Sequence, residues 1–343
     1  MRQKDIILYP LLCLYNCKKI MKKSCFILMY ITAFISPFYG SAGTSGGVLL
    51  KQFVGARAPA MGEAFVAVAD DIYALHYNPA GLVKINKEFS AIYYKDQTVD
   101  FSYGLIGYGQ SLKKIGTLAG SLFVYDAGKI SYEDEQGNLA TFNVQQDYLY
   151  TLGFARKLTK DLSLGTNFKT YISELKNGYY KANSFCFDMG GLYNTPVKGF
   201  SIGAVLQNVG TAIKYTKMEE KDPLPKTIRF GTAYRFQPLK GYKFTLSADI
   251  VKPNDNDLRK NFGMECSVRD LLYLRAGYKI GYDFVGNYSF GIGLRLSEVQ
   301  IDYGAVIQKF LMINPVSISW KKSKKQVKAI SSGGNMERVS IIK

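Results

Sequence analysis

The sequence predicts an all-β fold: a single transmembrane antiparallel β-barrel of about 14 strands with an N-terminal hatch or plug segment. Three observations lead to this prediction. The 343 residues include 33 Gly, 26 Tyr and 21 Phe, and short segments with alternating apolar and polar residues follow one another along the chain. The connections between these segments alternate between short and long. Aromatic side chains suit pleated strands, and glycine suits turns and close packing.

Composition and charge argue against several classes of function. With His76 as the single histidine, a His-based metal site or a Ser–His or Cys–His couple is hard to build, so we expect no enzyme, no metal and no cofactor. The net charge of +17 lies mostly at the two ends of the chain: residues 1–42 hold six basic and one acidic residue, and residues 321–343 hold seven and one. No basic folded face of a nucleic-acid-binding motif is visible, so nucleic acid is not an expected partner.

The first residues resemble an export signal. After Met21, Lys22 and Lys23 form a basic start, and an apolar run then leads to the small residues before a cleavage position after Ala42. We therefore assign residues 21–42 to a signal peptide and residues 1–20 to a non-native upstream extension. An uncleaved membrane anchor is the alternative interpretation of the same apolar run.

The body of the chain shows the alternation expected of strands with one apolar and one polar face. In 241–251, 287–296 and 298–307, every second residue is apolar and the residues between them are mostly polar or glycine. Each run is long enough for a tilted membrane strand. The predicted strands lie near 88–94, 99–109, 116–126, 146–158, 161–173, 183–194, 199–208, 226–236, 241–251, 261–267, 271–280, 287–296, 298–308 and 314–320.

Connection lengths favour a membrane barrel over a soluble β-sandwich or propeller, which are the alternatives. Connections after even-numbered strands are compact, whereas 127–145, 174–182, 209–225 and 252–260, after odd-numbered strands, are longer and polar. Outer-membrane barrels alternate short periplasmic turns with longer external loops in this way. We therefore expect a bacterial outer-membrane location, contact with outer-membrane lipid, and both termini in the periplasm.

Charged residues on the polar phase of the strands are predicted to face the lumen. There, cations and carboxylates can pair across the interior and hold its shape; a selectivity filter is the alternative interpretation. The predicted lumen residues are Arg229, Arg235, Lys243, Asp249, Arg275, Lys279, Arg295 and Asp302. The two cysteines beyond the signal, Cys186 and Cys266, fall on opposite strand faces and are expected to be unpaired.

Residues 43–87 do not follow the strand pattern and are assigned to the hatch or plug, before a barrel over 88–320 and a basic periplasmic tail over 321–343. Within this segment, Asp70 is expected to cap a short helix over 71–77 that Pro79 ends. An N-terminal arm packed below the barrel is the alternative to a plug. The candidate hatch or gate residues are His76, Asn78, Pro79, Ala80 and Gly81.

These residues carry a resemblance to a known family. The stretch from Gly55-Ala-Arg57 through Asp70-Asp71 to Asn78-Pro-Ala-Gly81 resembles the N-terminal signature of the PorV/PorQ family. That family resembles the wider FadL-like, long-chain fatty acid transporter-like superfamily of 14-stranded outer-membrane barrels, whose hatch contains a similar Asn-Pro-Ala box. Farther along the chain, 248–253, 274–279, 289–294 and 301–303 are similar to the carboxy-terminal half of PorV/PorQ proteins. The likeness covers roughly residues 46–320.

The resemblance implies two functions. The first is a non-enzymatic accessory of type IX-like secretion that binds or shuttles cargo, with secreted proteins and secretion machinery as partners and loops 127–145 and 209–225 as binding surfaces. The alternative is FadL-like uptake of long-chain fatty acids or other hydrophobic compounds through a hatch-gated lumen. In that case Asn78 and Pro79 would form the gate, and lumen arginines would attract a carboxylate.

The predicted architecture has a direct test. The purified protein should migrate faster on a detergent gel before boiling than after it, because a closed sheet resists detergent. It should also be found in the outer-membrane fraction. A protein in the soluble periplasmic fraction without such a heat-dependent shift would contradict the barrel and would favour a β-sandwich.

Overall fold

The computed structural model describes residues 43–96, 100–133, 137–282, 287–307 and 312–322. The predicted upstream extension (1–20), the signal peptide (21–42) and the basic tail beyond Lys322 lie outside these residues.

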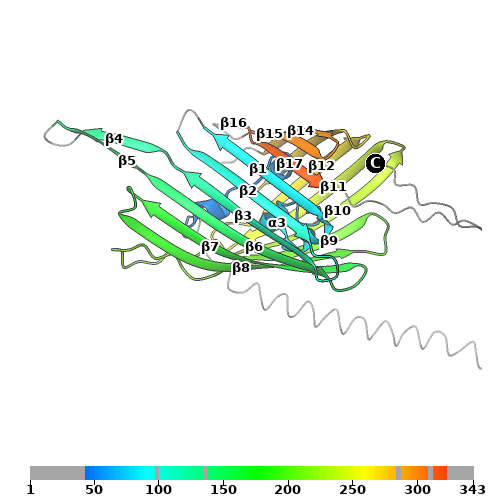
Figure 1. Ribbon diagram of the computed structural model, residues 1–343, viewed down its shortest axis with the longest axis horizontal. Helices are drawn as coiled ribbons and strands as arrows, with labels where there is room; N and C mark the ends of the chain where they lie inside the picture. Colours follow the sequence, from blue (N-terminus) through cyan, green and yellow to red (C-terminus); the bar gives the residue numbers. More distant parts are fainter. Residues whose placement is uncertain (1–42, 97–99, 134–136, 283–286, 308–311, 323–343) are drawn as a thin grey trace, which may run out of the picture.

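The described chain forms a closed barrel of 14 long antiparallel strands, which confirms the predicted all-β barrel (Figure 1). Barrel strands that follow one another in the chain pair with each other, and β1 closes the ring against β17. The two-residue strand β16 (Met312–Ile313) also pairs with β15. The barrel strands are β1 (Lys87–Lys95), β2 (Ser102–Ser111), β3 (Thr117–Asp126), β6 (Gln145–Lys157), β7 (Leu162–Leu175), β8 (Tyr180–Asn194), β9 (Phe200–Gly210), β10 (Thr227–Leu239), β11 (Tyr242–Pro253), β12 (Arg259–Val268), β13 (Leu272–Ile280), β14 (Tyr288–Leu296), β15 (Val299–Ile307) and β17 (Val316–Lys322).

Each predicted run coincides with one barrel strand to within a few residues at its ends. One hairpin was not predicted: β4 (Lys129–Glu133) pairs with β5 (Leu139–Asn143) within the connection that was expected to be a loop. Every residue of β4 is exposed. The hairpin buries neither of its faces in the barrel, and its two runs of five residues are shorter than the run that a tilted membrane strand needs, although Lys129–Glu133 alternates polar and apolar residues.

The outer face of the barrel is apolar, as the alternation predicts, and the inner face is polar except where inward residues of β2, β3 and β6 form part of the apolar core. Leu246 and Ile250 of β11 point outward, while Ser247 and Asp249 between them are buried inside. Cys186 and Cys266 lie on opposite faces and are both free. No described helix is long and apolar enough to cross a membrane.

The two described ends of the chain lie at opposite ends of the barrel. We call the end with the compact connections the short-turn end and the other the long-loop end. The Gly46 amide donates to the Pro223 carbonyl at 3.1 Å, within the long β9–β10 connection. Lys322 pairs with Lys87, beside the short β2–β3 turn. Residues 43 and 322 therefore lie at opposite ends of the barrel. The chain termini themselves lie outside the described residues, so the expectation that both are periplasmic stays a prediction.

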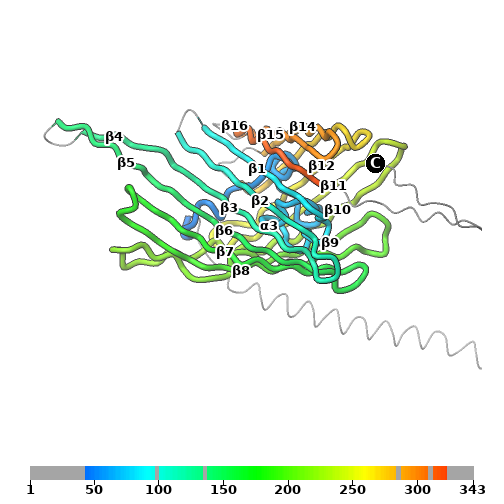
Figure 2. Tube along the Cα trace, in the orientation of Figure 1, coloured from blue at the N-terminus to red at the C-terminus, as the bar shows by residue number. Residues whose placement is uncertain are grey.

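The reason is that residues 43–86, here called the N-terminal segment, run along the inside of the barrel from one end to the other before β1 begins (Figure 2). The segment contains η1 (Val48–Lys51), α2 (Arg57–Ala60), α3 (Ala74–Tyr77) and η2 (Pro79–Lys84). The predicted helix over 71–77 is shorter than expected, and Asp70 does not cap it, because the Asp70 carboxylate pairs with Arg57 instead.

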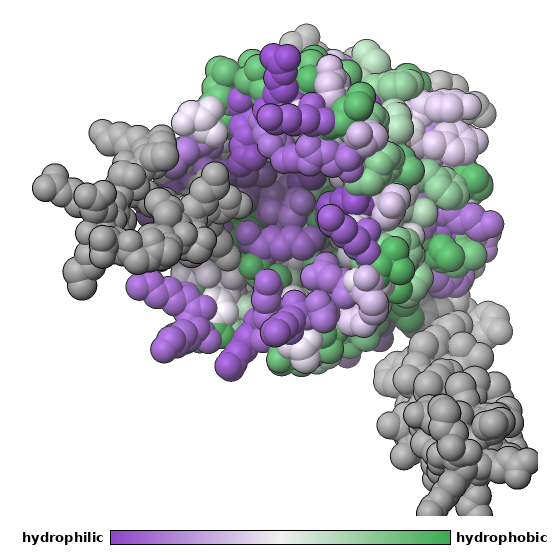
Figure 3. Space-filling model, turned by 90° about the vertical axis from the view of Figure 1, so that its right-hand side faces the viewer, coloured by the Kyte–Doolittle hydropathy of each residue, from purple (hydrophilic) through white to green (hydrophobic). Residues whose placement is uncertain are grey.

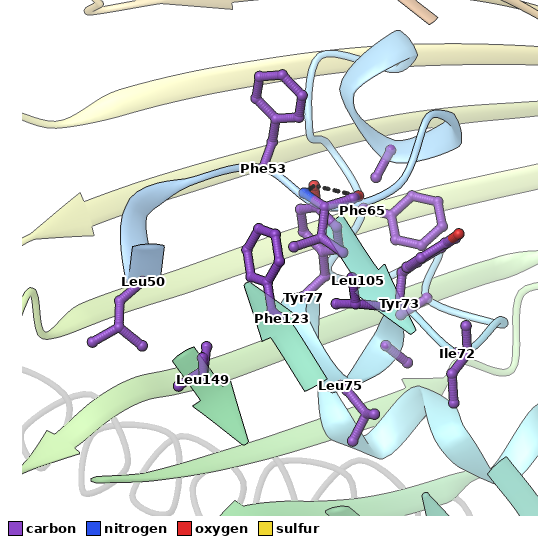
Figure 4. Packing of buried hydrophobic residues seen from close by; sticks show 14 of the residues in the cluster. Leu50, Phe53, Phe65, Ile72, Tyr73, Leu75, Tyr77, Leu105, Phe123 and Leu149 are labelled. Carbon is purple, nitrogen blue, oxygen red and sulfur yellow. Dashed lines mark hydrogen bonds between the residues drawn. The ribbon is translucent and has the colours of Figure 1, made fainter. Parts of the chain in front are cut away.

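The buried apolar core lies between the N-terminal segment and one side of the barrel wall. Phe65, Tyr73 and Tyr77 of the segment pack in a cluster that also contains inward residues of β2, β3 and β6 (Figure 4). The Tyr77 hydroxyl donates to the Val54 carbonyl at 3.2 Å, so its polar atom is satisfied inside the cluster. The wall residues labelled in Figure 4 are Leu105, Phe123 and Leu149.

Glycines on the inner wall allow the backbone of the N-terminal segment to come very close. A Cβ atom added at Gly277 would lie 2.0 Å from the Gly62 amide nitrogen, and one added at Gly203 would lie 2.7 Å from the Val66 carbonyl oxygen. Backbone atoms of the segment come equally close to Gly165 and Gly263, and side-chain atoms of the segment come close to Gly190 and Gly291. These glycines lie on six different strands, so the wall is shaped to the segment around much of its circumference.

Replacement of Gly277 by alanine should therefore lower the stability of the barrel. The added methyl group has no space beside backbone atoms, and such overpacking costs about 1–3 kcal/mol. The check is a urea titration in which the unboiled, fast-migrating gel band reports the folded barrel. Gly191→Ala is the matched control, because its methyl group would meet only Leu164 Cδ2 at 3.5 Å. Equal midpoints for the two variants would contradict the close packing.

Candidate functional site

Asn78 joins two parts of the N-terminal segment to the barrel wall. Its side chain is completely buried. The Asn78 side-chain nitrogen donates to the Val66 carbonyl at 2.9 Å and to the Gly191 carbonyl of β8 at 3.1 Å, while its Oδ1 accepts from the Ala80 amide at 3.1 Å. Three hydrogen bonds from one buried amide fix this position, since leaving any of these groups unpaired costs free energy.

The residues after Asn78 press against wall glycines. A Cβ at Gly190 would lie 2.1 Å from Asn78 Oδ1, and one at Gly165 would lie 2.4 Å from both the Ala80 amide nitrogen and the Pro79 carbonyl carbon. Gly81 faces the Ala69 carbonyl oxygen at a distance that admits no side chain. The structure thus brings Asn78, Pro79, Ala80 and Gly81 together, as a contact between η2 and strands β7 and β8.

His76 takes part in a different contact. Its carbonyl oxygen accepts from the Gln207 side chain at 2.5 Å, and its ring meets the Tyr77 ring edge-on at 5.0 Å between centroids. Burial, together with the positive charges of Lys169 and Arg229, lowers the pKa of His76 to about 3. The imidazole is therefore neutral at physiological pH.

Arg57 is the centre of a charged network inside the barrel. Its guanidinium lies 2.5 Å from Asp70 and 3.2 Å from Asp71, and its Nε donates to Glu265 at 2.8 Å. Burial raises the pKa of Asp70, but the nearby charges of Arg57, Lys84 and Arg235 outweigh that effect and hold it below its usual range. The segment is thus attached to β12 by buried ion pairs.

Two of the predicted lumen residues complete this network. Arg275 of β13 donates through Nε to Glu265 at 2.8 Å and through Nη1 to Asp302 of β15 at 2.8 Å. A buried carboxylate that pairs with two guanidiniums is compensated, whereas a lone one is costly. The network therefore connects β12, β13 and β15 to the N-terminal segment.

The other predicted lumen residues also lie on the inner face. Asp249 accepts from the Phe65 and Val66 amides at 2.8 and 2.9 Å, and Lys279 hydrogen-bonds Glu63. Burial opposes ionisation of Glu63, yet the charges of Lys279 and Arg229 lower its pKa. The remaining four are Arg229 over the Tyr77 ring, Arg235 on the Val68 carbonyl, Lys243 paired with Asp270, and Arg295 at the short-turn end.

Two cavities lie on either side of the N-terminal segment. One, of about 970 Å³ at the short-turn end, is lined by residues such as Arg235, Lys243 and Arg295, and we call it the short-turn cavity. Figure 3 shows it as a hollow with a hydrophilic surface. The other, of about 420 Å³, is lined by His76, Arg229 and other mostly polar residues. An apolar space beside Leu149 measures only about 10 Å³.

At the long-loop end, the two connections expected to bind partners differ from each other. In the β9–β10 connection, Ile213 and Leu224 are buried, so it packs inward over the start of the N-terminal segment. The β4–β5 hairpin instead projects beyond the barrel rim (Figure 1). Its Tyr132 and Phe142 rings meet edge-on at 5.8 Å, and Leu139 is 81% exposed.

Comparison with known proteins agrees with this geometry. The family model described as "Type IX secretion system protein PorV" matches residues 43–253, which include the N-terminal segment and the strands that hold the Asn78 contact. The chain belongs to this family. No curated protein matches the sequence.

Several solved structures share the fold of this PorV-family barrel. The Pseudomonas putida toluene transporter TodX aligns with a TM-score of 0.52 at 12% identity, over 82% of this chain and 98% of that one. The CymD monoaromatic hydrocarbon channel aligns with a TM-score of 0.52 at 11% identity, over 79% of this chain and 98% of the channel. A Pseudomonas aeruginosa FadL homologue aligns with a TM-score of 0.50 at 10% identity, over 82% of this chain and 98% of the homologue. At such identities the likeness concerns the fold alone, and it confirms the expected FadL-like barrel.

Sequence reasoning missed the partners that the N-terminal segment supplies. Arg57, Glu63 and Asp70 pair with wall residues or with each other, yet none was predicted to bind the lumen charges. The signal was present, because these charged residues interrupt an otherwise small and apolar stretch. A buried charge needs a partner, so charges in this stretch point to opposite charges on the wall.

Replacement of Glu265 by glutamine should destabilise the PorV-family barrel strongly. The substitution keeps the size of the side chain but removes the charge shared by Arg57 and Arg275, and breaking a buried pair costs about 3–5 kcal/mol. Urea titration of the unboiled gel band measures the effect. Asp270→Asn is the matched control: its pair with Lys243 is about half exposed, and such pairs contribute at most about 1 kcal/mol. If both variants unfold at the same urea concentration, the network does not hold the segment.

Proposed function

We propose that this protein is a non-enzymatic accessory of type IX secretion that binds secreted proteins or secretion machinery at the outer membrane. The observation that carries the proposal is the N-terminal segment inside the lumen, attached to the wall by buried hydrogen bonds and ion pairs. With the lumen occupied in this way, the surfaces that remain accessible to a protein partner are the two ends of the barrel.

The orientation follows from the connection lengths. Short turns face the periplasm in outer-membrane barrels, and long loops face outward. Lys322 then lies on the periplasmic side, and residue 43 lies in the outer half of the lumen. The β4–β5 hairpin projects from the cell, where exported cargo emerges.

The hairpin is the proposed surface for cargo. Ile130, Tyr132 and Phe142 lie on one face, because Ile130 pairs with Phe142 across the two strands and Tyr132 is two residues farther along β4. Exposed apolar and aromatic residues are enriched where protein partners bind. The base of the hairpin is attached to the β7–β8 turn, where the Asn143 amide donates to Asn177 Oδ1 at 2.7 Å, so the apolar face is held in a defined position.

Uptake of hydrophobic compounds, the alternative function, has less support. Most residues that line the two large cavities are charged or polar, and the apolar space measured above is about the size of one water molecule. The contact around Asn78 and Pro79 has no room for a sliding motion, because the wall glycines touch its backbone. We infer that the Asn78–Gly81 box anchors the segment and that it is not a gate.

A triple variant of the hairpin, Ile130→Ser, Tyr132→Ser and Phe142→Ser, should reduce the amount of type IX cargo on the cell surface at least tenfold. The variant loses the apolar face without touching the barrel, so its heat-dependent gel shift should be unchanged. The measurement is surface labelling of cargo in cells that carry the variant as their sole copy. The matched control is Lys129→Ser, Glu133→Ser and Thr141→Ser on the opposite face, which keeps the net charge.

Normal cargo exposure in the apolar-face variant would overturn the hairpin as the cargo surface. If removal of the whole protein left cargo unaffected and abolished uptake of a labelled long-chain fatty acid, the secretion role would fail and uptake would replace it.

A further inference from the structure

The short-turn cavity has an excess of positive charge that the barrel itself does not neutralise. Seven lysine and arginine side chains line it, against three aspartate and glutamate side chains. Walls of low dielectric around a hollow of one sign concentrate the electric field and attract ions of the opposite sign. The cavity opens at the short-turn end, where Figure 3 shows its hydrophilic mouth.

The three carboxylates in the cavity already have cationic partners. Asp70 and Glu265 pair with Arg57 at 2.5 and 2.8 Å, and Asp270 pairs with Lys243 at 2.6 Å. A fourth pair uses a further cation of the lining, because Lys321 lies 3.4 Å from Glu88 of β1. The remaining positive charge therefore comes from other side chains.

Four cations are left over in this lining: Lys84, Lys198, Arg235 and Arg295. Among the described residues, Lys198 and Arg295 have no side-chain hydrogen bond or ion pair within bonding distance. Arg235 lies 3.8 Å from Asp70, a carboxylate that Arg57 holds more closely, and it donates to the Val68 carbonyl at 2.7 Å. These side chains leave donor groups for a ligand.

Lys84 is half-buried at the last turn of η2. Its ammonium donates to the Val68 carbonyl at 3.1 Å. Burial lowers the pKa of Lys84 to about 7, and Arg235 and Arg57 add to that effect while Asp70 and Asp71 oppose it. A negative group brought beside Lys84 would favour its protonated form.

The size of the cavity and the sequence of the chain restrict the occupant. A volume of about 970 Å³ is at the upper end for sites that hold drug-sized ligands, so it accepts several residues of polypeptide and far exceeds one small anion. The chain's own residues 323–343 carry five basic residues and one acidic residue, so their charge has the wrong sign to fill it. Its charged side chains come from the N-terminal segment, from inward-facing strand positions and from short turns.

We propose that the short-turn cavity binds an acidic segment of another polypeptide, whose carboxylates contact Lys84, Lys198, Arg235 and Arg295. Charge-assisted hydrogen bonds between carboxylates and lysine or arginine are among the stronger polar contacts in proteins. The site faces away from the β4–β5 hairpin, so the two ends of the barrel bind different partners. This proposal depends on the proposed function in one respect: the orientation assumed there places the cavity, and therefore its partner, on the periplasmic side.

The experiment measures binding of a dye-labelled peptide of eight glutamates to the purified full-length barrel in detergent, by fluorescence anisotropy. The peptide should bind at least tenfold more tightly than the same peptide with glutamine in place of glutamate, and added salt should weaken it. The double variant Lys198→Gln, Arg295→Gln should weaken binding at least fivefold, and the barrel should fold normally because neither side chain has a hydrogen-bond or ion-pair partner in the part of the chain that the structure describes.

Lys113→Gln, Lys160→Gln is the matched control, since both lysines are exposed in turns at the same end and neither lines the cavity. An equal loss of affinity in the control and cavity variants would mean nonspecific attraction and would overturn the site. Displacement of the peptide by inorganic pyrophosphate at a concentration below the peptide's own Kd would assign the cavity to a small phosphate ligand instead. None of these outcomes depends on secretion, so this site and the hairpin succeed or fail separately.

Discussion

A closed ring of backbone hydrogen bonds is the constraint on which the rest of this structure depends. A strand in a bilayer has no water to satisfy its amides and carbonyls, so every strand must pair on both sides. The ladder between β1 and β17 closes the ring, and closure fixes which residues face lipid and which face inward. The polar surface of the lumen is therefore a consequence of closure combined with strict alternation. The charged side chains on that surface are buried and need partners of opposite charge.

The N-terminal segment supplies partners for the charged side chains of the lumen. Arg57 and Glu63 bring charges to Glu265 and Lys279 on the wall, and the amides of Phe65 and Val66 satisfy Asp249. The wall glycines allow the segment's backbone to approach closely enough for these contacts. Packing and electrostatics thus favour the same position of the segment, which is why we regard it as a fixed part of the barrel.

Because the N-terminal segment runs through the lumen, this PorV-family protein has two separate ends. Its long-loop end carries a projecting hairpin with an apolar face, and its short-turn end carries a cavity with unbalanced positive charge. The FadL-like channels with which it shares a fold show that the same barrel can serve different purposes. What distinguishes this chain is the chemistry of its lumen and of its two rims.

The sequence by itself determined the barrel: its strand positions, its inward and outward faces, and the inward placement of Arg275, Lys279 and Asp302 follow from local alternation that needs no knowledge of distant residues. Only the tertiary structure decided how the N-terminal segment lies, because Arg57 meets Glu265 across more than two hundred positions of sequence. It also revealed the β4–β5 hairpin and placed residue 43 at the long-loop end. The physical reason is that the alternation of apolar and polar residues along a strand shows which of its faces is buried. The contacts between the N-terminal segment and the wall depend instead on the shape and charge of residues that come together only after the barrel has closed.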